Sequence, residues 1–266
     1  MDISFVILTW NSSGYLRKCF RSLMRVLSDS SYSYEIFVVD NGSTDDSAKI
    51  IDEFCREDNS IHLIQLEQNI GTTKSRNIAL RRCRGEYICI LDSDIEFEGN
   101  VFPDLLQVLS RSDDIGMVVP QLIYPSGKWQ KSVDRFPTLP HKIRRFFFLR
   151  QIEAGEWAEV GNNGFSCEKT VDYAISAFWL LKRDVLEKIG LLDEKIFYAP
   201  EDVDFCLRVW KGGNSIVYVP SRRAIHHTQE ISRGMNLNKA KMEHIKGLFY
   251  FFVKHKYLFR APCFLK

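Results

Sequence analysis

The sequence has little net charge, no closely paired cysteines and no long apolar run, and each absence excludes a class of protein. Its 266 residues include 36 Lys and Arg against 34 Asp and Glu, so a net charge of +2 provides no bulk attraction for nucleic acid. Seven scattered cysteines, without a C-x-x-C pair, argue against a disulfide framework and favour a reducing compartment. No apolar stretch is long enough to span a bilayer, and no signal-peptide pattern follows Met1. We therefore expect a cytoplasmic protein with, at most, peripheral contact at the inner face of a membrane.

Two common phosphate-binding motifs are also absent. The turn after the first apolar run, Trp10-Asn11-Ser12-Ser13-Gly14, lacks the G-x-G-x-x-G pattern, and no G-x-x-x-x-G-K-[ST] loop occurs in the chain. A dinucleotide-binding fold of the usual kind and a P-loop are therefore not expected.

What the sequence does contain is a regular alternation of apolar strands and amphipathic helices in its first 98 residues. Short runs rich in β-branched and aromatic residues predict buried strands over Ile3–Thr9, Glu35–Asp40, Ile61–Leu66 and Tyr87–Leu91. Apolar residues at helical spacing lie between them, so we expect β-α-β units and a mainly parallel sheet.

Two helix ends can be predicted in this half. Ser43 and Asp46 resemble a capping box, with Asp in the place of the usual Glu, at the start of a helix that continues through Phe54. The helix from Thr72 is expected to end at Gly85, because glycine is favoured just past a helix.

The second half is less regular. Several prolines and glycines between residues 124 and 170 predict a long, partly mobile excursion. The remaining predicted elements are a helix over 101–109, a strand over 116–123, a strand-like run over 171–181, helices over 184–189 and 201–211, a last strand over 215–219, and a basic and apolar helical tail from 239.

Polar side chains follow three of the four predicted parallel strands, at Thr9-Trp10-Asn11, Asp40-Asn41-Gly42 and Asp92-Ser93-Asp94. Because parallel strands deliver their carboxyl ends to one edge of a sheet, these loops should build one site. Asp92 and Asp94 would repel each other unless a cation lies between them. Mg²⁺ or Mn²⁺ suits such oxygen ligands and often binds substrate phosphates as well.

Five motifs occur in a fixed order. They are V-V-D-N-G-S-T-D-D-S at 38–47, N-I-G-T-T-K-S-R-N at 69–77, L-D-S-D at 91–94, A-F-W-L-L-K-R at 177–183, and G-L-L-D-E-K-I-F-Y-A-P-E-D-V-D-F-C-L-R at 190–208. Together they resemble the inverting family-two glycosyltransferases with the GT-A fold, particularly the rhamnosyltransferase-like branch that builds polysaccharides. The resemblance covers residues 3 to about 234.

The resemblance implies an α/β protein with a mainly parallel nucleotide-binding sheet flanked by helices and a smaller, mixed acceptor-side region. We accordingly expect a nucleotide-sugar-binding half at 1–98, an acceptor-binding and catalytic half at 99–234, and a helical tail at 235–266. The implied reaction moves a sugar from a nucleotide-diphosphate sugar to a hydroxyl of a glycan or lipid-linked acceptor, in cell-surface polysaccharide synthesis.

The resemblance also implies roles for individual residues. Asp202 matches the catalytic base, which would take the proton of the acceptor hydroxyl. Trp179 and Glu201 match the acceptor side, and Asp94 matches the metal-and-diphosphate motif. The residues implied to bind the nucleotide sugar are Thr9, Asn11, Asp40, Asn69, Gly71, Arg76, Asn77, Asp92 and Ser93.

A divalent metal, Mn²⁺ or Mg²⁺, is implied at Asp92 and Asp94, together with a late histidine. His226 and His227 are adjacent and leave the register open, and His227 is the favoured ligand. Asp204 precedes Arg208 by four residues, so a pair along one helix is its expected role.

Two other functions share parts of this pattern. A sugar-nucleotide nucleotidyltransferase would use similar carboxylates and a metal, but usually has a Gly-rich loop with Arg and Lys after the first strand, which is missing here. A carbohydrate-binding protein without catalysis would not need the complete set of aspartates.

Two basic and aromatic stretches bear on the location of the acceptor. Residues 141–150 place four cations around Phe146-Phe147-Phe148-Leu149, and residues 246–260 contain Phe249-Tyr250-Phe251-Phe252 followed by further cations. Apolar faces edged with cations suit an anionic lipid surface, although packing on the domain's own core is the alternative.

Overall fold

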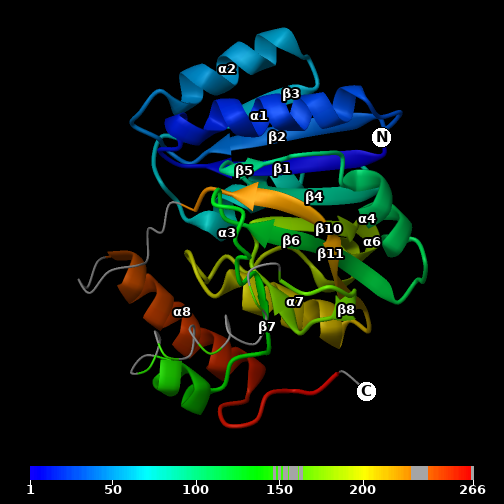
Figure 1. The fold of residues 1–266 in the computed structure, drawn as a ribbon. Helices are drawn as coiled ribbons and strands as arrows, with labels where there is room; N and C mark the ends of the chain where they lie inside the picture. The colour runs from blue at the N-terminus through cyan, green and yellow to red at the C-terminus, as the bar shows by residue number, and fades with distance from the viewer. Residues whose placement is uncertain are drawn as a thin grey trace.

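The centre of the protein is a nine-stranded mixed sheet with helices on both faces (Figure 1). Its strand order is β3-β2-β1-β4-β10-β6-β11-β5, and β8 also pairs with β11. The computed structural model describes the whole chain except residues 146–147, 149–150, 152–154, 156–160, 162–163, 229–238 and 265–266. The predicted α/β architecture, with a mainly parallel sheet in its first half, is confirmed.

The first half of the chain forms the parallel part of the sheet. β1 (Ile3–Thr9) pairs with β2 (Tyr34–Asp40) on one side and with β4 (Tyr87–Asp92) on the other, and β3 (Ile61–Gln65) pairs with β2. The connecting helices are α1 (Ser13–Ser28), α2 (Ser47–Glu57) and α3 (Thr72–Leu80).

The second half adds antiparallel pairs. β10 (Phe178–Lys182) lies antiparallel between β4 and β6 (Ile115–Ile123), and β11 (Ser215–His226) runs parallel to β6. β5 (Ile95–Glu96) pairs antiparallel with the end of β11. The remaining elements are α4 (Phe102–Leu109), β7 (Val133–Asp134), β8 (Lys169–Thr170), β9 (Tyr173–Ala174), α6 (Arg183–Ile189), α7 (Glu201–Lys211) and α8 (Lys239–His255).

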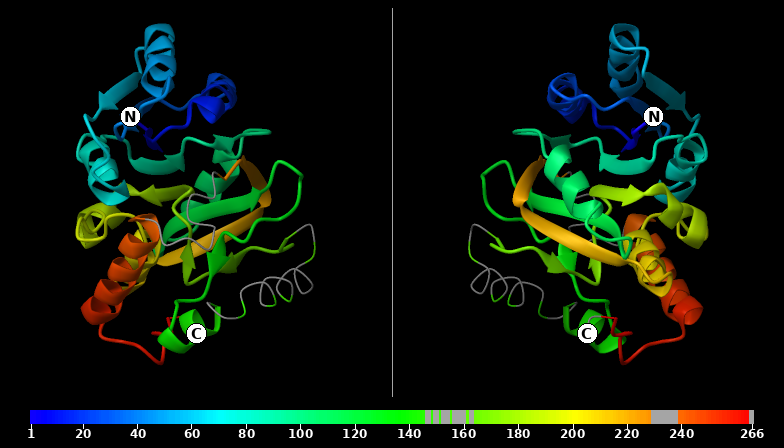
Figure 2. Two further views of the ribbon diagram at one scale, coloured as in Figure 1. Left: turned by 90° about the vertical axis from the view of Figure 1, so that its left-hand side faces the viewer. Right: turned by 90° about the vertical axis from the view of Figure 1, so that its right-hand side faces the viewer.

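The core has two layers because the strands are buried on both faces. On β1, Phe5 and Ile7 point into a cluster with α1, α2 and α4, whereas Val6 points into a cluster with α3, α6 and α7. Each fully buried side chain of this size contributes about 1.5–3 kcal/mol. Figures 1 and 2 show α1 and α2 at one end of the molecule and α8 at the other.

Two predictions about helix ends were wrong. α3 ends at Leu80 instead of continuing to Arg84, because the Arg84 amide donates to Glu35 Oε1 (2.6 Å) and the Gly85 amide to Ser4 Oγ (2.7 Å). The capping box of Ser43 and Asp46 is also absent. Ser43 Oγ instead donates to the Asp40 carboxylate, as described below for the site.

Two strand predictions were wrong in their limits. The run over 171–181 is divided into β9 and β10, and β11 continues seven residues beyond the predicted end at Val219. A register shift between Val219 and Arg223 accommodates Pro220, so the proline interrupts the ladder without ending the strand. In the excursion over 124–170, the described side chains of Trp129 and Phe136 are buried.

Helix α8 contains part of the second basic and aromatic stretch, and two of its aromatic residues, Phe251 and Phe252, pack into the core. Of the first stretch, Phe146, Phe147, Leu149 and Arg150 lie outside the described residues. Across the described part of the chain, no helix is both long enough and apolar enough to cross a bilayer.

Candidate active site

The carboxyl ends of β1, β2 and β4 lie side by side, as the order of the strands predicted. Thr9 on β1 is in register with Asp40 on β2, and Leu8 is in register with Asp92 on β4. Three polar strand ends therefore meet at one edge of the sheet, where ligands bind in open α/β sheets.

Two buried oxygen atoms at this edge lack a partner within the described part of the chain. They are Thr9 Oγ1 and Asp40 Oδ2, on side chains that are almost wholly inaccessible. The other Asp40 oxygen, Oδ1, accepts hydrogen bonds from the amide (3.1 Å) and the hydroxyl of Ser43. Because buried acceptors are rarely left without a donor, the free oxygens indicate a place for the hydroxyl or N–H groups of a ligand.

Asn11 organises the neighbouring loop. Its backbone has a positive φ of 50°, its Oδ1 accepts from the Thr44 amide (2.8 Å), and its own amide donates to Ser43 Oγ (2.9 Å). These bonds hold the loop after β1 against the loop after β2, so Asn11 shapes the rim of the site around Asp40.

The segment from Asn69 to Asn77 closes the site from the side of α3. Asn69 Oδ1 accepts from Asn41 Nδ2 (3.1 Å) and from the Gly71 amide (3.0 Å). Gly71 has φ of 93°, and a Cβ there would come within 2.4 Å of the Phe197 carbonyl oxygen. Glycine is therefore required for the close approach of this turn to the loop before α7.

The side chain of Asn77 bonds to the loop at residues 192–194. It is buried, its Nδ2 donates to the Leu192 carbonyl (2.8 Å) and Glu194 Oε1 (3.0 Å), and its Oδ1 accepts from the Leu192 amide (3.1 Å). Its donors and its acceptor are used by the 192–194 loop. The implied nucleotide contact of Asn77 is therefore corrected to a bond between α3 and that loop.

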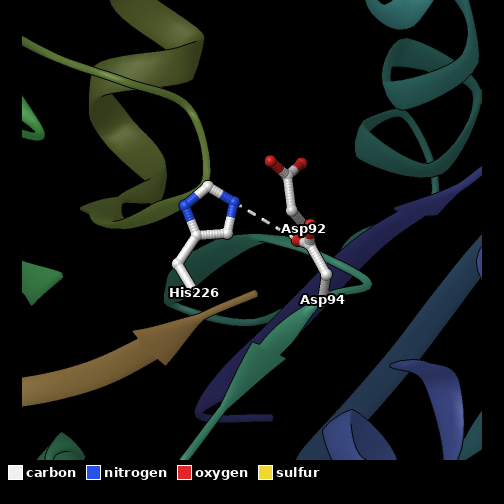
Figure 3. A group of neighbouring side chains, drawn as sticks. All are labelled: Asp92, Asp94 and His226. Carbon is white, nitrogen blue, oxygen red and sulfur yellow. Dashed lines mark ion pairs between the residues drawn. The ribbon is translucent and has the colours of Figure 1, made fainter. Parts of the chain in front are cut away.

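Asp92, Asp94 and His226 form a group that could hold a metal ion (Figure 3). One ligand atom from each residue lies within 4.8 Å of the others, and His226 Nε2 is 3.3 Å from Asp94 Oδ1. Asp94 Oδ1 is buried, and its described polar contact is this one with the His226 ring. The donor set, two carboxylates and one imidazole, fits a divalent cation such as Mn²⁺. Ser93, between the two aspartates, is buried.

The histidine of this group is His226, which corrects the preference for His227. β5 follows the aspartates directly and pairs with the end of β11, with His226 opposite Ile95. Since successive strand residues point to opposite sides, His227 turns away and its Nε2 lies 2.7 Å from Glu96 Oε2. His226 Nδ1 is 3.1 Å from Gln130 Oε1, so Gln130 holds the ring with Nε2 facing the aspartates.

Arg76 connects the metal group to the acceptor side. Its guanidinium is buried, donates to Asp92 Oδ1 (2.5 Å) and to Ser176 Oγ (2.7 Å), and lies 3.8 Å from Glu201 Oε1. Ser176 Oγ in turn donates to Glu201 Oε1 (2.9 Å). Arg76 therefore holds two carboxylates in place.

Glu201 and Asp202 begin helix α7 and differ in environment. Burial and the neighbouring Asp202 raise the pKa of Glu201 to about 8. Burial also raises the pKa of Asp202, although the Val203 amide, which donates to Oδ1 (2.8 Å), and the charge of Lys142 oppose this shift. Asp202 is only partly buried, so it is the carboxylate of the two that a substrate can reach.

Burial similarly raises the pKa of Asp92, against the charge of Arg76 and with the help of Asp94. Asp92 nevertheless keeps 34% of its side chain accessible, whereas Asp94 keeps 9%. A ligand at this edge would therefore meet Asp92 first.

Trp179 is a core residue, which corrects its implied contact with the acceptor. Its side chain is wholly inaccessible, stacks on Phe205 with ring centroids 5.2 Å apart, and donates from Nε1 to the Ala174 carbonyl (3.1 Å). The alternation along β10 directs it into the layer beneath α7.

Two residues at the site were not identified from the sequence. Gln130 orients His226, and Ser176 bridges Arg76 and Glu201. Neither lies in a recognisable pattern, because each acts on partners between 25 and 100 residues away.

Comparison with families of known proteins gives one match over most of the chain. The family model described as "Glycosyl transferase family 2" matches residues 4–190, which is more than half of the sequence.

Two curated relatives illustrate the range of similarity. Glycosyltransferase GlyG of Streptococcus pneumoniae is 33% identical over 111 residues, covering 42% of this chain and 36% of that protein. N-acetylglucosaminyl-diphospho-decaprenol L-rhamnosyltransferase of Mycobacterium tuberculosis is 25% identical over 243 residues, covering 85% of this chain and 77% of that protein. The chain thus spans about a third of the length of the first of these relatives (36%).

Solved structures show the same fold at low sequence identity. Mannosyltransferase PcManGT from Pyrobaculum calidifontis, in complex with GDP-Man and Mn²⁺, matches with a TM-score of 0.60 and 16% identity, covering 98% of this chain and 65% of that one. S. aureus TarS in complex with UDP-GlcNAc matches with a TM-score of 0.60 and 18% identity, covering 96% and 66%. This likeness confirms the GT-A architecture.

Proposed function

The chain belongs to glycosyl transferase family 2, and from this premise we propose that it is an inverting, metal-dependent enzyme that transfers a sugar from a nucleotide-diphosphate sugar to a hydroxyl group. The observation that supports the proposal is the grouping, at one sheet edge, of a buried unpartnered oxygen on Asp40 with the group of Asp92, Asp94 and His226. Arg76 links this group to Glu201, the chain neighbour of Asp202. These are the three parts that the reaction needs: a nucleoside site, a diphosphate site and a base.

The donor site is proposed for residues 1–98 and the acceptor side for residues 99–234. A curated relative is named a rhamnosyltransferase, and a solved structure with a similar fold is a mannosyltransferase in complex with GDP-Man. Both support a nucleotide-sugar donor. A glycan or a lipid-linked sugar is the proposed acceptor, in the synthesis of a cell-surface polysaccharide. A lipid-linked acceptor would place the reaction at a membrane surface.

Asp92, Asp94 and His226 are the residues that would hold a divalent metal, since one ligand atom from each lies within 4.8 Å of the others. Such an ion, when bound, stabilises the negative charge that develops on a departing diphosphate. The charge of Arg76 opposes the burial that raises the pKa of Asp92, and its guanidinium fixes the carboxylate beside that position. Gln130 fixes the ring of His226.

Asp202 is the proposed base. Its carboxylate would accept the proton of the acceptor hydroxyl while that oxygen attacks the anomeric carbon on the face opposite the diphosphate, so the configuration inverts. The burial that raises the pKa of Asp202 makes its carboxylate a stronger base than a fully solvated aspartate. Glu201, bonded to Ser176, would remain behind it as a support.

Replacement of this base is the most direct test. Asp202→Asn should retain donor binding and the melting temperature but lower the rate of sugar transfer by about 10²–10⁴-fold. Asp184→Asn is the matched control, because Asp184 also lies in the first turn of a helix, α6, and is exposed. The rates would be measured by incubating each purified variant with a panel of nucleotide sugars, Mn²⁺ and a glycan acceptor. Transfer by Asp202→Asn at the wild-type rate would show that another group removes the proton.

A further inference from the structure

Helix α8 presents an apolar stripe that the protein itself does not cover. Four of its large apolar side chains are exposed: Met242 (47%), Ile245 (56%), Phe249 (73%) and Val253 (60%). At about 100° per residue, their positions fall within roughly 80° of the helix circumference. These four residues, called the α8 stripe, therefore form one continuous apolar face of the helix.

The apolar surface extends past the end of the helix. Leu258 and Phe259 are 43% and 71% exposed, and the Leu258 carbonyl accepts a hydrogen bond from the Leu139 amide (2.7 Å). That bond ties the chain after α8 to the helical residues 139–145, where Ile143 is also exposed (50%). Apolar patches that continue across several segments are uncommon on monomeric proteins and mark interaction sites.

Cations surround this surface. Lys246, Lys256 and Arg260 are exposed, and the acidic neighbour Glu243 is partly buried and pairs with Lys246 (2.8 Å). A mainly basic rim disfavours a twofold contact with a second copy, because like charges would face each other across the axis. The same rim favours an anionic lipid surface, which attracts Lys and Arg while apolar side chains enter the interface.

The opposite face of α8 is fixed to the candidate catalytic segment. Gly247 is buried there, and a Cβ at this position would come within 2.3 Å of the Ala199 carbonyl oxygen, three residues before Asp202. Glycine inside a helix costs about 1 kcal/mol relative to alanine, so this close approach has a stability cost that packing must offset. The helix is thus in direct backbone contact with the loop that leads into α7.

Ion pairs hold the far end of α8 against the same elements. Lys254 Nζ lies 2.7 Å from Asp193 Oδ2 and 2.6 Å from Asp204 Oδ1, and His255 Nε2 lies 2.8 Å from Asp204 Oδ1. Tyr250 donates to Asp193 as well (2.9 Å). The outward direction of the α8 stripe is therefore determined by contacts on the inner face.

We propose that the α8 stripe docks the protein on an anionic membrane surface. The inner and outer faces of α8 are separated by one helix diameter, about 10–12 Å with side chains. A membrane bound to the stripe would then lie only that distance from the Ala199 segment that precedes Asp202. This deepens the proposed function, since it supplies a surface from which a lipid-linked acceptor can reach the site.

Vesicle flotation tests the docking without donor, metal or acceptor. The full chain should float with vesicles of phosphatidylcholine and phosphatidylglycerol at low salt, float less with phosphatidylcholine alone, and float less again as salt screens the cations. The double variant Phe249→Glu with Val253→Glu should remain in the dense fractions. Both positions are highly exposed, so its melting temperature should stay near that of the wild type.

The matched control is Asn59→Asp with Gln107→Glu, which adds the same two negative charges at exposed positions outside α8 and should float as the wild type does. Wild-type protein that stays in the dense fractions at low salt, or a stripe variant that floats normally, would overturn the proposal. A wild-type dimer that the stripe variant dissociates would also overturn it, in favour of a second copy. A protein that floats but transfers no sugar would leave the docking intact and contradict only the proposed function.

Discussion

At the scale of single residues, the candidate site depends on buried polar atoms that the chain leaves without partners. Thr9 Oγ1 and Asp40 Oδ2 are such atoms among the described residues. An unpaired buried acceptor costs about 1–3 kcal/mol, a cost that a ligand's donor group would remove. Both lie at strand ends that face the same edge, which is why we assign them to ligand recognition.

The choice between the adjacent histidines gives the sharpest prediction at this scale. His226→Ala should weaken Mn²⁺ binding by at least the ~10–100-fold that loss of a supporting residue typically causes. His227→Ala should bind nearly as well as wild type, because the His227 ring contacts Glu96. Calorimetric titration of Mn²⁺ in the presence of a nucleoside diphosphate would measure both. Equal losses in the two variants would contradict the assignment to His226.

At the scale of elements, the first turn of α7 contains both the proposed base and a residue that holds α8. Asp202 is partly accessible, whereas Asp204, two residues later, is wholly buried between α7 and α8. The expected pair with Arg208 is confirmed (2.9 Å), but His255 and Lys254 also contact the Asp204 carboxylate. Asp204 therefore holds α8 against α7.

This arrangement predicts a stability effect with a definite pH dependence. Burial would raise the pKa of Asp204, but His255, Arg208 and Lys254 outweigh it and place the pKa far below its usual value. The unfolded state then binds more protons than the folded state near pH 4, so this stabilisation is present above about pH 4 and is lost as the pH falls. Asp204→Asn should lower the free energy of unfolding by about 3–5 kcal/mol at neutral pH and flatten its decline in acid.

Urea unfolding from neutral to acidic pH would measure this effect. Asp52→Asn is the matched control, because Asp52 also pairs with an arginine four residues later but is half exposed. Its loss should cost no more than about 0.5 kcal/mol. If the two variants lose equal stability, the ion pairs around Asp204 do not fasten α8 as we infer.

At the scale of the whole molecule, the site is assembled from both halves of the sheet. Asp40 and Asp92 come from the parallel half, whereas His226 is delivered by β11, across β5. Arg76 reaches from α3 to Ser176 and toward Glu201. A donor that binds at this edge contacts distant parts of the fold at once and should stabilise all of it.

A thermal-shift experiment would show this coupling. Uridine, guanosine and thymidine diphosphates should be compared with and without Mn²⁺, since binding to the native state alone raises the melting temperature by mass action. At a concentration about 100 times the Kd, a ligand adds about 2.7 kcal/mol, which corresponds to several degrees in a protein of this size. Asp40→Asn should reduce the shift. No shift with any nucleotide and metal would contradict a nucleoside site at this edge.

Local patterns in the sequence determined the elements and the strand ends. Apolar runs with polar residues directly after them predicted β1, β2 and β4, with Asp40 and Asp92 at the carboxyl ends of β2 and β4, because strand burial and turn formation depend on neighbouring residues. The ordered motifs extended this to the GT-A fold, which the structural likeness confirms.

Only the tertiary structure decided which side chains face one another. The pairing of β5 with β11 selected His226 over His227, and the alternation along β10 placed Trp179 in the core. The side-chain amide of Asn77 bonds to residues more than 100 positions away, and Ser176 lies 100 residues from its partner Arg76. The physical reason is that such contacts depend on how separate elements pack, and no spacing within one element encodes them.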